Sequence, residues 1–292
     1  MTLRAEGHAI PTGNPTMKLY ATAKGLVAET DGRLHLLQAS VGFDSIFSDA
    51  NPAAALGRGL ARSKRIGRLP PLRAPLQSQE VWAAGVTYKR SRTARMSESK
   101  AAGGGSFYDR VYDAVRPELF FKATPHRVAA SGQTVRIRGD SKWNVPEPEL
   151  TLAISATGRI FGYTIGNDMS SRDIEGENPL YLPQAKVYDR SAAIGPCVLV
   201  CEEAPGPDTE ISIEIRRGSA TVFSGATRVG EIKRSFTELA GFLFRDNSFP
   251  SGCYLMTGTG VVPGDGFTLQ PGDRIAITIP AIGTLVNRVA RS

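Results

Sequence analysis

Short apolar segments separated by turn residues follow one another from Gly132 onward, and this pattern restricts the fold more than any other feature of the chain. Thr157-Gly158 joins two of the segments by a two-residue turn, as in a hairpin. With 31 glycines and 19 prolines against 8% aromatic residues, the composition favours turns and strands over a helix bundle. The sequence therefore predicts a mainly β fold of the α+β kind. The segments of strand length cover residues 134–138, 149–156, 159–167 and 193–200.

The first 75 residues have the features of a small separate unit. Asp31-Gly32 lies between two apolar segments and is typical of a β-hairpin, and Asn51-Pro52 can begin a helix. Three prolines then fall within residues 69–76, which predicts an extended, semi-rigid boundary. The 292 residues can bury one large core with a small appendage. The predicted units are a small N-terminal α+β domain, 1–75, and a main domain, 76–292.

Composition and charge narrow the partners and the location. The formal charge is +7, but the basic clusters at 62–68 and 89–95 are not interleaved with stacking aromatics. We therefore expect no nucleic acid partner and a small anionic substrate instead. No segment approaches the roughly 18 apolar residues of a membrane span, and no apolar signal segment follows Met1, so we expect a cytoplasmic protein without a membrane partner. Three cysteines make a disulfide framework improbable.

Two glutamates and an aspartate form a candidate metal site. Glu147 and Glu149 are two residues apart, so in a strand both side chains lie on one face. A hairpin turning at Thr157-Gly158 pairs positions that sum to about 315, which brings Asp168 near Glu147. Three carboxylates suit Mg²⁺, Mn²⁺ or Ca²⁺, and the absence of neighbouring His and Cys argues against zinc. On spacing alone, a solvated group of acids is the more common alternative.

Two further segments carry charged residues that bear on this site. Residues 167–186 form a long polar stretch between two predicted strands, and such an insertion is more often a site than a plain connection. Glu118 and Lys122 are four apart in a short predicted strand and so share a face, either as a surface ion pair or as an acid and a cation beside a metal. Arg172 and Asp173 are expected to pair with each other or with a loop backbone.

Several ordered motifs between about residues 80 and 290 resemble those of the fumarylacetoacetate hydrolase family. The resemblance implies a β-roll or barrel-like catalytic domain that assembles as a homodimer or homotetramer. It also implies a divalent cation, Mg²⁺ with Mn²⁺ or Ca²⁺ as alternatives, held by Glu147, Glu149 and Asp168. The motifs are Glu147-Pro-Glu149, Gly162-Tyr-Thr-Ile-Gly-Asn-Asp-Met-Ser-Ser-Arg-Asp173, Lys186, Ile194-Gly-Pro196, Met256-Thr-Gly-Thr-Gly-Val-Val262 and Gly283-Thr-Leu-Val-Asn287.

Within that family, segments 116–124, 145–149 and 177–188 are most similar to the 2-keto-3-deoxy-pentonate dehydratases. The resemblance implies conversion of 2-dehydro-3-deoxy-D-arabinonate, the D-xylonate-derived intermediate, to 2,5-dioxopentanoate through a metal-stabilised enolate. The hydrolases commonly carry a His and Glu dyad where this chain has Ser91 and Ala94. This absence disfavours, without excluding, a C–C hydrolase of a 2,4-diketo acid of the acylpyruvate type. A third hypothesis is a binding or scaffold protein without catalytic activity. The presence of all three acids together with Lys186 and Glu118 argues against it.

The resemblance and the chemistry of the side chains together suggest roles for the remaining residues. A carboxylate and an amine near a cation can each be tuned toward neutrality, so Glu118 and Lys186 form the expected acid and base pair, in either order. Lys186 could instead only neutralise the charge that develops on the substrate. The expected substrate-binding residues are Thr257, Thr259, Arg90 and Tyr88.

Overall fold

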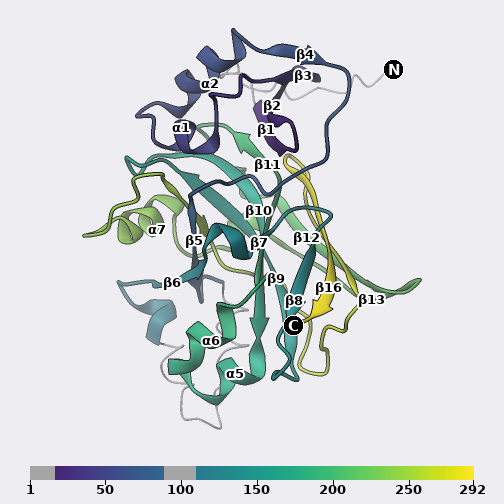
Figure 1. The fold of residues 1–292 in the computed structure, drawn as a ribbon. Coiled ribbons are helices and arrows are strands. Elements are labelled where there is room, and N and C mark those ends of the chain that lie inside the picture. The colour runs from purple at the N-terminus through teal and green to yellow at the C-terminus, as the bar shows by residue number, and fades with distance from the viewer. Residues whose placement is uncertain (1–16, 89–109) are drawn as a thin grey trace, which may run out of the picture.

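Two β-sheets form the body of the computed structural model, which describes residues 17–88 and 110–292 (Figure 1). The larger sheet has eleven strands in the order β4-β3-β2-β1-β11-β10-β9-β14-β5-β6, with β7 paired to β11 beside this path. The smaller has five, in the order β13-β12-β15-β16-β8. The mainly β class is confirmed, and both sheets are open rather than closed into a barrel. The strands are β1 Met17–Thr22, β2 Gly25–Thr30, β3 Arg33–Leu36, β4 Lys64–Ile66, β5 Glu80–Gly85, β6 Glu118–Ala123, β7 Val128–Ala129, β8 Thr134–Ile137, β9 Asn144–Ile154, β10 Ile160–Ser171, β11 Ala192–Val200, β12 Glu210–Arg217, β13 Ala220–Arg228, β14 Cys253–Met256, β15 Arg274–Ile279 and β16 Gly283–Arg291.

The helices are short and connect or cover the strands. Helices α5 and α6 follow β10 at one end of the molecule, whereas α1 and α2 lie at the opposite end with β1 to β4 (Figure 1). Within the described ranges, no helix is long and apolar enough to cross a membrane. The three cysteines are free thiols, as expected. The α-helices are α1 Phe43–Phe47, α2 Pro52–Leu60, α5 Arg172–Glu177, α6 Leu182–Lys186 and α7 Phe236–Leu243, and the 3-10 helices are η1 Pro125–Arg127, η2 Pro179–Tyr181 and η3 Val229–Glu231.

The β9–β10 hairpin forms the centre of the larger sheet, and its register is the one the turn predicts. Gly158 has a φ of 80°, which a residue with a side chain rarely adopts, and Asp168 pairs directly with Glu147. Both strands are longer than expected: β9 begins at Asn144 and β10 continues to Ser171. Every residue of β9 is buried, because the strand is covered on both faces.

The two faces of β9 have different neighbours. Leu150, Leu152 and Ile154 belong to the core cluster that also contains Ile213 and Ile277 of the smaller sheet. Side chains alternate along a strand, so the odd-numbered positions, which include the two glutamates, point to the opposite face. The apolar contact between the sheets therefore fixes which face carries the carboxylates.

The N-terminal strands extend the larger sheet. β1 pairs antiparallel with β11, with Met17 opposite Val200, and β2 and β3 form the expected hairpin around Asp31-Gly32. Both turn residues have positive φ, 50° and 68°, as a two-residue type I′ turn requires. The expected helix after Asn51 is α2, and the Asn51 side chain accepts a hydrogen bond from Ala54 N. The division of the chain at residue 75 remains a prediction.

Candidate active site

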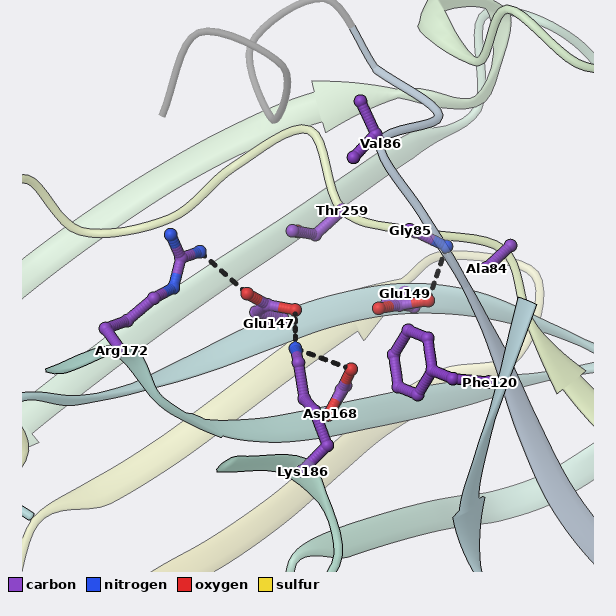
Figure 2. A pocket seen from close by; sticks show the side chains of 11 residues that line it. Ala84, Gly85, Val86, Phe120, Glu147, Glu149, Asp168, Arg172, Lys186 and Thr259 are labelled. Atoms are coloured by element: carbon purple, nitrogen blue, oxygen red, sulfur yellow. Dashed lines mark hydrogen bonds and ion pairs between the residues drawn. The ribbon is translucent and has the colours of Figure 1, made fainter. Parts of the chain in front are cut away.

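Three buried carboxylates converge on one face of the β9–β10 hairpin (Figure 2). Glu147 and Glu149 come from alternate positions of β9, and Asp168 lies opposite Glu147 on β10. One oxygen from each lies within 4.8 Å of the others, and none of the three residues is more than 4% exposed. They line a cavity together with Arg172, Lys186 and other residues. The remaining lining residues are Ala84, Gly85, Val86, Phe120, Gly258 and Thr259.

Lys186 lies directly against two of these carboxylates. Its Nζ donates to Glu147 Oε2 at 2.8 Å, to Asp168 Oδ2 at 2.9 Å and to Ser170 Oγ at 2.5 Å. The lysine is completely buried at the end of α6, where the stretch after β10 turns back toward the sheet. The expected combination of Lys186 with the acids is therefore present in the structure.

Glu149 has no such cation beside it. Its Oε2 accepts a hydrogen bond from Gly258 N at 2.5 Å, and among the described residues no lysine or arginine forms an ion pair with it. Burial raises the pKa of Glu149 well above its usual range, and the charges of Asp168 and Glu147 raise it further. A hard divalent cation would supply the missing positive charge, and carboxylate oxygens are its preferred ligands. The donor set therefore fits Mg²⁺.

Glu118 approaches the cavity from β6. It lies opposite Gly85 of β5, and a side-chain carbon at position 85 would come within 1.9 Å of Glu118 Oε2. The glycine thus leaves the space that the carboxyl group occupies. Since Gly85 itself lines the cavity, the Glu118 carboxyl lies beside the cavity wall.

The four residues expected to bind substrate differ in their positions. Thr259 lines the cavity, and its hydroxyl donates to Val261 O at 3.0 Å. The Thr257 hydroxyl instead donates to Leu150 O at 2.8 Å, so it anchors the glycine-rich turn to β9. Tyr88 is 1% exposed, and burial, together with the Glu149 charge, raises its pKa. The remaining candidate, Arg90, lies outside the described residues, as do positions 91 and 94 of the expected dyad comparison.

Asp173 contacts a loop backbone, as one of the two alternatives predicted, but the expectation for Arg172 was wrong. Arg172 forms an ion pair with Glu147 Oε1 at 2.7 Å instead of pairing with Asp173. Asp173 accepts hydrogen bonds from Ser141 Oγ at 2.5 Å and Lys142 N at 2.7 Å. The reason is the length of β10: the strand continues through residue 171, so the arginine begins α5 at the strand end, next to the cavity.

Lys122 is buried beside the acids, so it does not form the surface ion pair that was one of its two expected roles. Its Nζ is 2.6 Å from Asp168 Oδ1, and it also donates to Met169 O at 2.9 Å and to Lys186 O. Burial lowers its pKa, and the charge of Asp168 opposes that effect. The even spacing from Glu118 on one strand was the available signal, because it placed both side chains on the face of β6 that meets the site.

Comparison with known proteins identifies the family. The model of the fumarylacetoacetate (FAA) hydrolase C-terminal domain matches residues 81–290, most of the chain. This chain belongs to the fumarylacetoacetate hydrolase family. The match begins at β5 and includes every residue that lines the cavity.

Two similar proteins are named as dehydratases of 2-keto-3-deoxy sugar acids. A probable 2-keto-3-deoxyxylonate dehydratase of Haloferax volcanii is 50% identical over 216 residues, which cover 74% of this chain and 73% of the relative. A 2-dehydro-3-deoxy-D-arabinonate dehydratase of Saccharolobus solfataricus is 43% identical over 220 residues, covering 74% of each. A solved 2-keto-3-deoxy-D-arabinonate dehydratase, complexed with magnesium and 2,5-dioxopentanoate, is 31% identical with a TM-score of 0.80, covering 95% of this chain and 99% of that one.

Proposed function

We propose that the protein is a metal-dependent dehydratase that converts 2-dehydro-3-deoxy-D-arabinonate to 2,5-dioxopentanoate. One observation carries the proposal: the buried Glu147, Glu149 and Asp168 cluster, with its lysine, lies in the part of the chain that matches two named dehydratases at 43% and 50% identity. The related structure contains magnesium and 2,5-dioxopentanoate, and it supports the proposed cation and the proposed product.

Glu147, Glu149 and Asp168 would hold Mg²⁺. When bound, Mg²⁺ acts as a Lewis acid that makes the C3 protons of a 2-keto acid more acidic. Burial of the three carboxylates keeps water away from them and strengthens every charge interaction in the cavity. Arg172 forms an ion pair with Oε1 of Glu147, and Lys122 forms one with Oδ1 of Asp168. These ion pairs keep the two carboxylates in fixed positions when substrate enters.

Glu118 and Lys186 are the proposed proton-transfer groups. One of them removes a C3 proton and the other donates a proton to the C4 hydroxyl, which leaves as water. The resulting C3=C4 alkene still carries its C5 hydroxymethyl group. Loss of one proton from C5 and one from its oxygen, with addition of one proton each at C3 and C4, gives the terminal aldehyde. Thr259 on the cavity wall is the proposed contact for the substrate carboxylate, with Tyr88 and Arg90 at the hydroxyl end.

A product assay tests this proposal. Purified protein with Mg²⁺ and 2-dehydro-3-deoxy-D-arabinonate should form an aldehyde at the rate at which the substrate disappears. A 2,4-diketo acid serves as the second substrate. Release of pyruvate or another short acid from the diketo acid, without aldehyde from the sugar acid, would contradict the dehydratase and support a C–C hydrolase.

Substitution of one metal-binding carboxylate tests the site itself. Glu149→Gln removes a charge while keeping the shape of the side chain, and it should abolish metal-dependent turnover without unfolding the protein. Glu203→Gln is the matched control, since Glu203 is an exposed glutamate that does not line the cavity. Turnover that survives in the Glu149 variant would show that the cation is held elsewhere.

Three further expectations also stand as proposals. We propose that the chain forms a homodimer or homotetramer, which size-exclusion chromatography with light scattering measures directly. A cytoplasmic location and the division into units 1–75 and 76–292 are proposed as well, and limited proteolysis near residues 69–76 tests the division.

A further inference from the structure

A fourth buried carboxylate lies near two of the cations that contact the proposed metal ligands. Glu175 belongs to α5, is 1% exposed, and lies beside two cations of the cavity. Its Oε1 is 3.9 Å from Lys186 Nζ and its Oε2 is 3.9 Å from Arg172 Nε. Both cations make shorter contacts with the metal-binding carboxylates, so Glu175 is their more distant acidic neighbour.

The Lys186 ammonium group contacts two of the three carboxylates that would hold a divalent cation. It donates to Glu147 Oε2 at 2.8 Å and to Asp168 Oδ2 at 2.9 Å. A divalent cation held by the same carboxylates would add two positive charges beside this ammonium group. Positive charges repel strongly in a buried site. Binding of the metal would therefore favour movement of the ammonium group away from these carboxylates.

The movement is confined to the side chain. Lys122 donates a hydrogen bond to the Lys186 carbonyl, which ties the end of α6 to β6. A buried ammonium group needs a compensating carboxylate. Glu175 is the further carboxylate that already lies 3.9 Å from Lys186 Nζ, and an approach of about 1 Å makes this contact a hydrogen bond.

We propose that Glu175 is a positioning residue that accepts the Lys186 ammonium group when a divalent cation takes Glu147 and Asp168. The inference rests on the proposed metal site. Among the described residues, Lys122, Arg172 and Lys186 already contact the carboxylates of Glu147 and Asp168, so the two positive charges of the ion would add to a site rich in cations, where Glu175 supplies a further negative charge. Glu175 thus keeps Lys186 charged, buried and beside the cavity in the metal-bound protein.

A double-mutant cycle on metal affinity tests this role. Isothermal titration calorimetry of Mg²⁺ into metal-stripped protein compares wild type, Glu175→Gln, Lys186→Met and the double variant. Glu175→Gln should weaken Mg²⁺ binding on the order of tenfold when Lys186 is present, and by less than about threefold when Lys186 is Met. Lys186→Met alone should tighten binding, because the competing ammonium group is gone. Equal weakening in both backgrounds, or no weakening in either, would overturn the inference.

Control variants separate this inference from the metal site on which it rests. Glu177→Gln makes the same change at an exposed position of α5 and should leave the affinity for Mg²⁺ unchanged. If wild type binds no Mg²⁺, or if Glu149→Gln binds it equally well, the proposed metal site fails. If both controls behave as expected and the cycle shows no coupling, only the role of Glu175 fails.

A second substitution covers the case in which Glu175→Gln does not fold. Thermal melting of each metal-free variant reports folding before titration. Glu175→Asp keeps the charge but withdraws it by one methylene group, so it should weaken Mg²⁺ binding by about threefold in a manner that depends on Lys186. Wild-type affinity in the Glu175→Asp variant would contradict the proposal.

Discussion

Replacing Lys122 by methionine should destabilise the protein more than the loss of any surface lysine. The ammonium group has no exposed surface and makes three contacts, with Asp168 Oδ1 at 2.6 Å, Met169 O at 2.9 Å and Lys186 O. Methionine nearly matches the length of the lysine side chain, so it fills the space without a large cavity. What the substitution removes is the charge, with its ion pair to Asp168, and the two hydrogen bonds donated to backbone carbonyls.

The size of the effect follows from two opposing contributions. Breaking a buried ion pair by removing one partner costs about 3–5 kcal/mol, because the remaining charge is left in a poorly solvated place. Asp168 keeps Lys186 as a second cation, and the burial that lowers the pKa of Lys122 no longer opposes folding, so we expect the lower end, about 3 kcal/mol. At roughly 2–4 °C per kcal/mol for a chain of this size, the melting temperature should fall by roughly 6–12 °C.

Differential scanning calorimetry of metal-free protein measures this change, and Lys233→Met is the matched control. Lys233 also contacts a carboxylate and a carbonyl, Asp113 Oδ1 at 2.5 Å and Tyr112 O at 2.7 Å, but on the exposed surface. Its loss should cost less than about 1 kcal/mol. A Lys122→Met melting temperature within about 2 °C of the control variant would refute the reasoning from burial.

Four further predictions concern the cavity. Because the pKa of Glu149 is raised in the folded state, metal-free protein should gain stability as the pH falls toward the ordinary range of a glutamate. Mg²⁺ affinity should fall by about tenfold per pH unit over the same interval, measured by calorimetry, and Glu149→Gln should lose this dependence. Gly85→Ala should push the Glu118 carboxyl aside and reduce turnover by about 10–100-fold in a steady-state assay, with Mg²⁺ affinity unchanged. Mg²⁺ at a hundredfold its Kd should stabilise the protein by about 2.7 kcal/mol in thermal melts, and a chelator should reverse this.

The carboxylate cluster could be predicted from the sequence because the turn of a hairpin determines which residues pair across its two strands. Once Thr157-Gly158 is recognised as the turn, antiparallel pairing sets the partner of every position, and Asp168 falls opposite Glu147. The alternation of strand side chains then places Glu149 on the same face. Two local rules were therefore enough for three residues that are up to 21 positions apart in the chain.

The cations around the cluster could not be predicted in the same way. Lys122 lies on β6 and Arg172 on α5. Neither element belongs to the β9–β10 hairpin, so the register of the hairpin does not place these side chains. Their positions depend on how far β10 continues and on how the segments after it fold back, and both are tertiary properties. Long basic side chains are usually exposed, so their burial here only becomes evident when the opposing acids are in place.

The two prolines beside the glutamates suit the place where the pairing of β9 with β14 ends. Leu150 directs its carbonyl toward the β14 side, where it accepts a hydrogen bond from Thr257 N at 3.1 Å. Backbone groups alternate in direction along a strand, so Pro148 and Pro146 face the same side, beyond the last paired position, where β14 has already ended. Proline has no N–H, so neither position needs an acceptor on that side of the strand. Gly258 N donates to the Glu149 carboxylate instead of to the strand. The alternation of proline and glutamate therefore suits the end of the ladder and places both proposed ligands on one face.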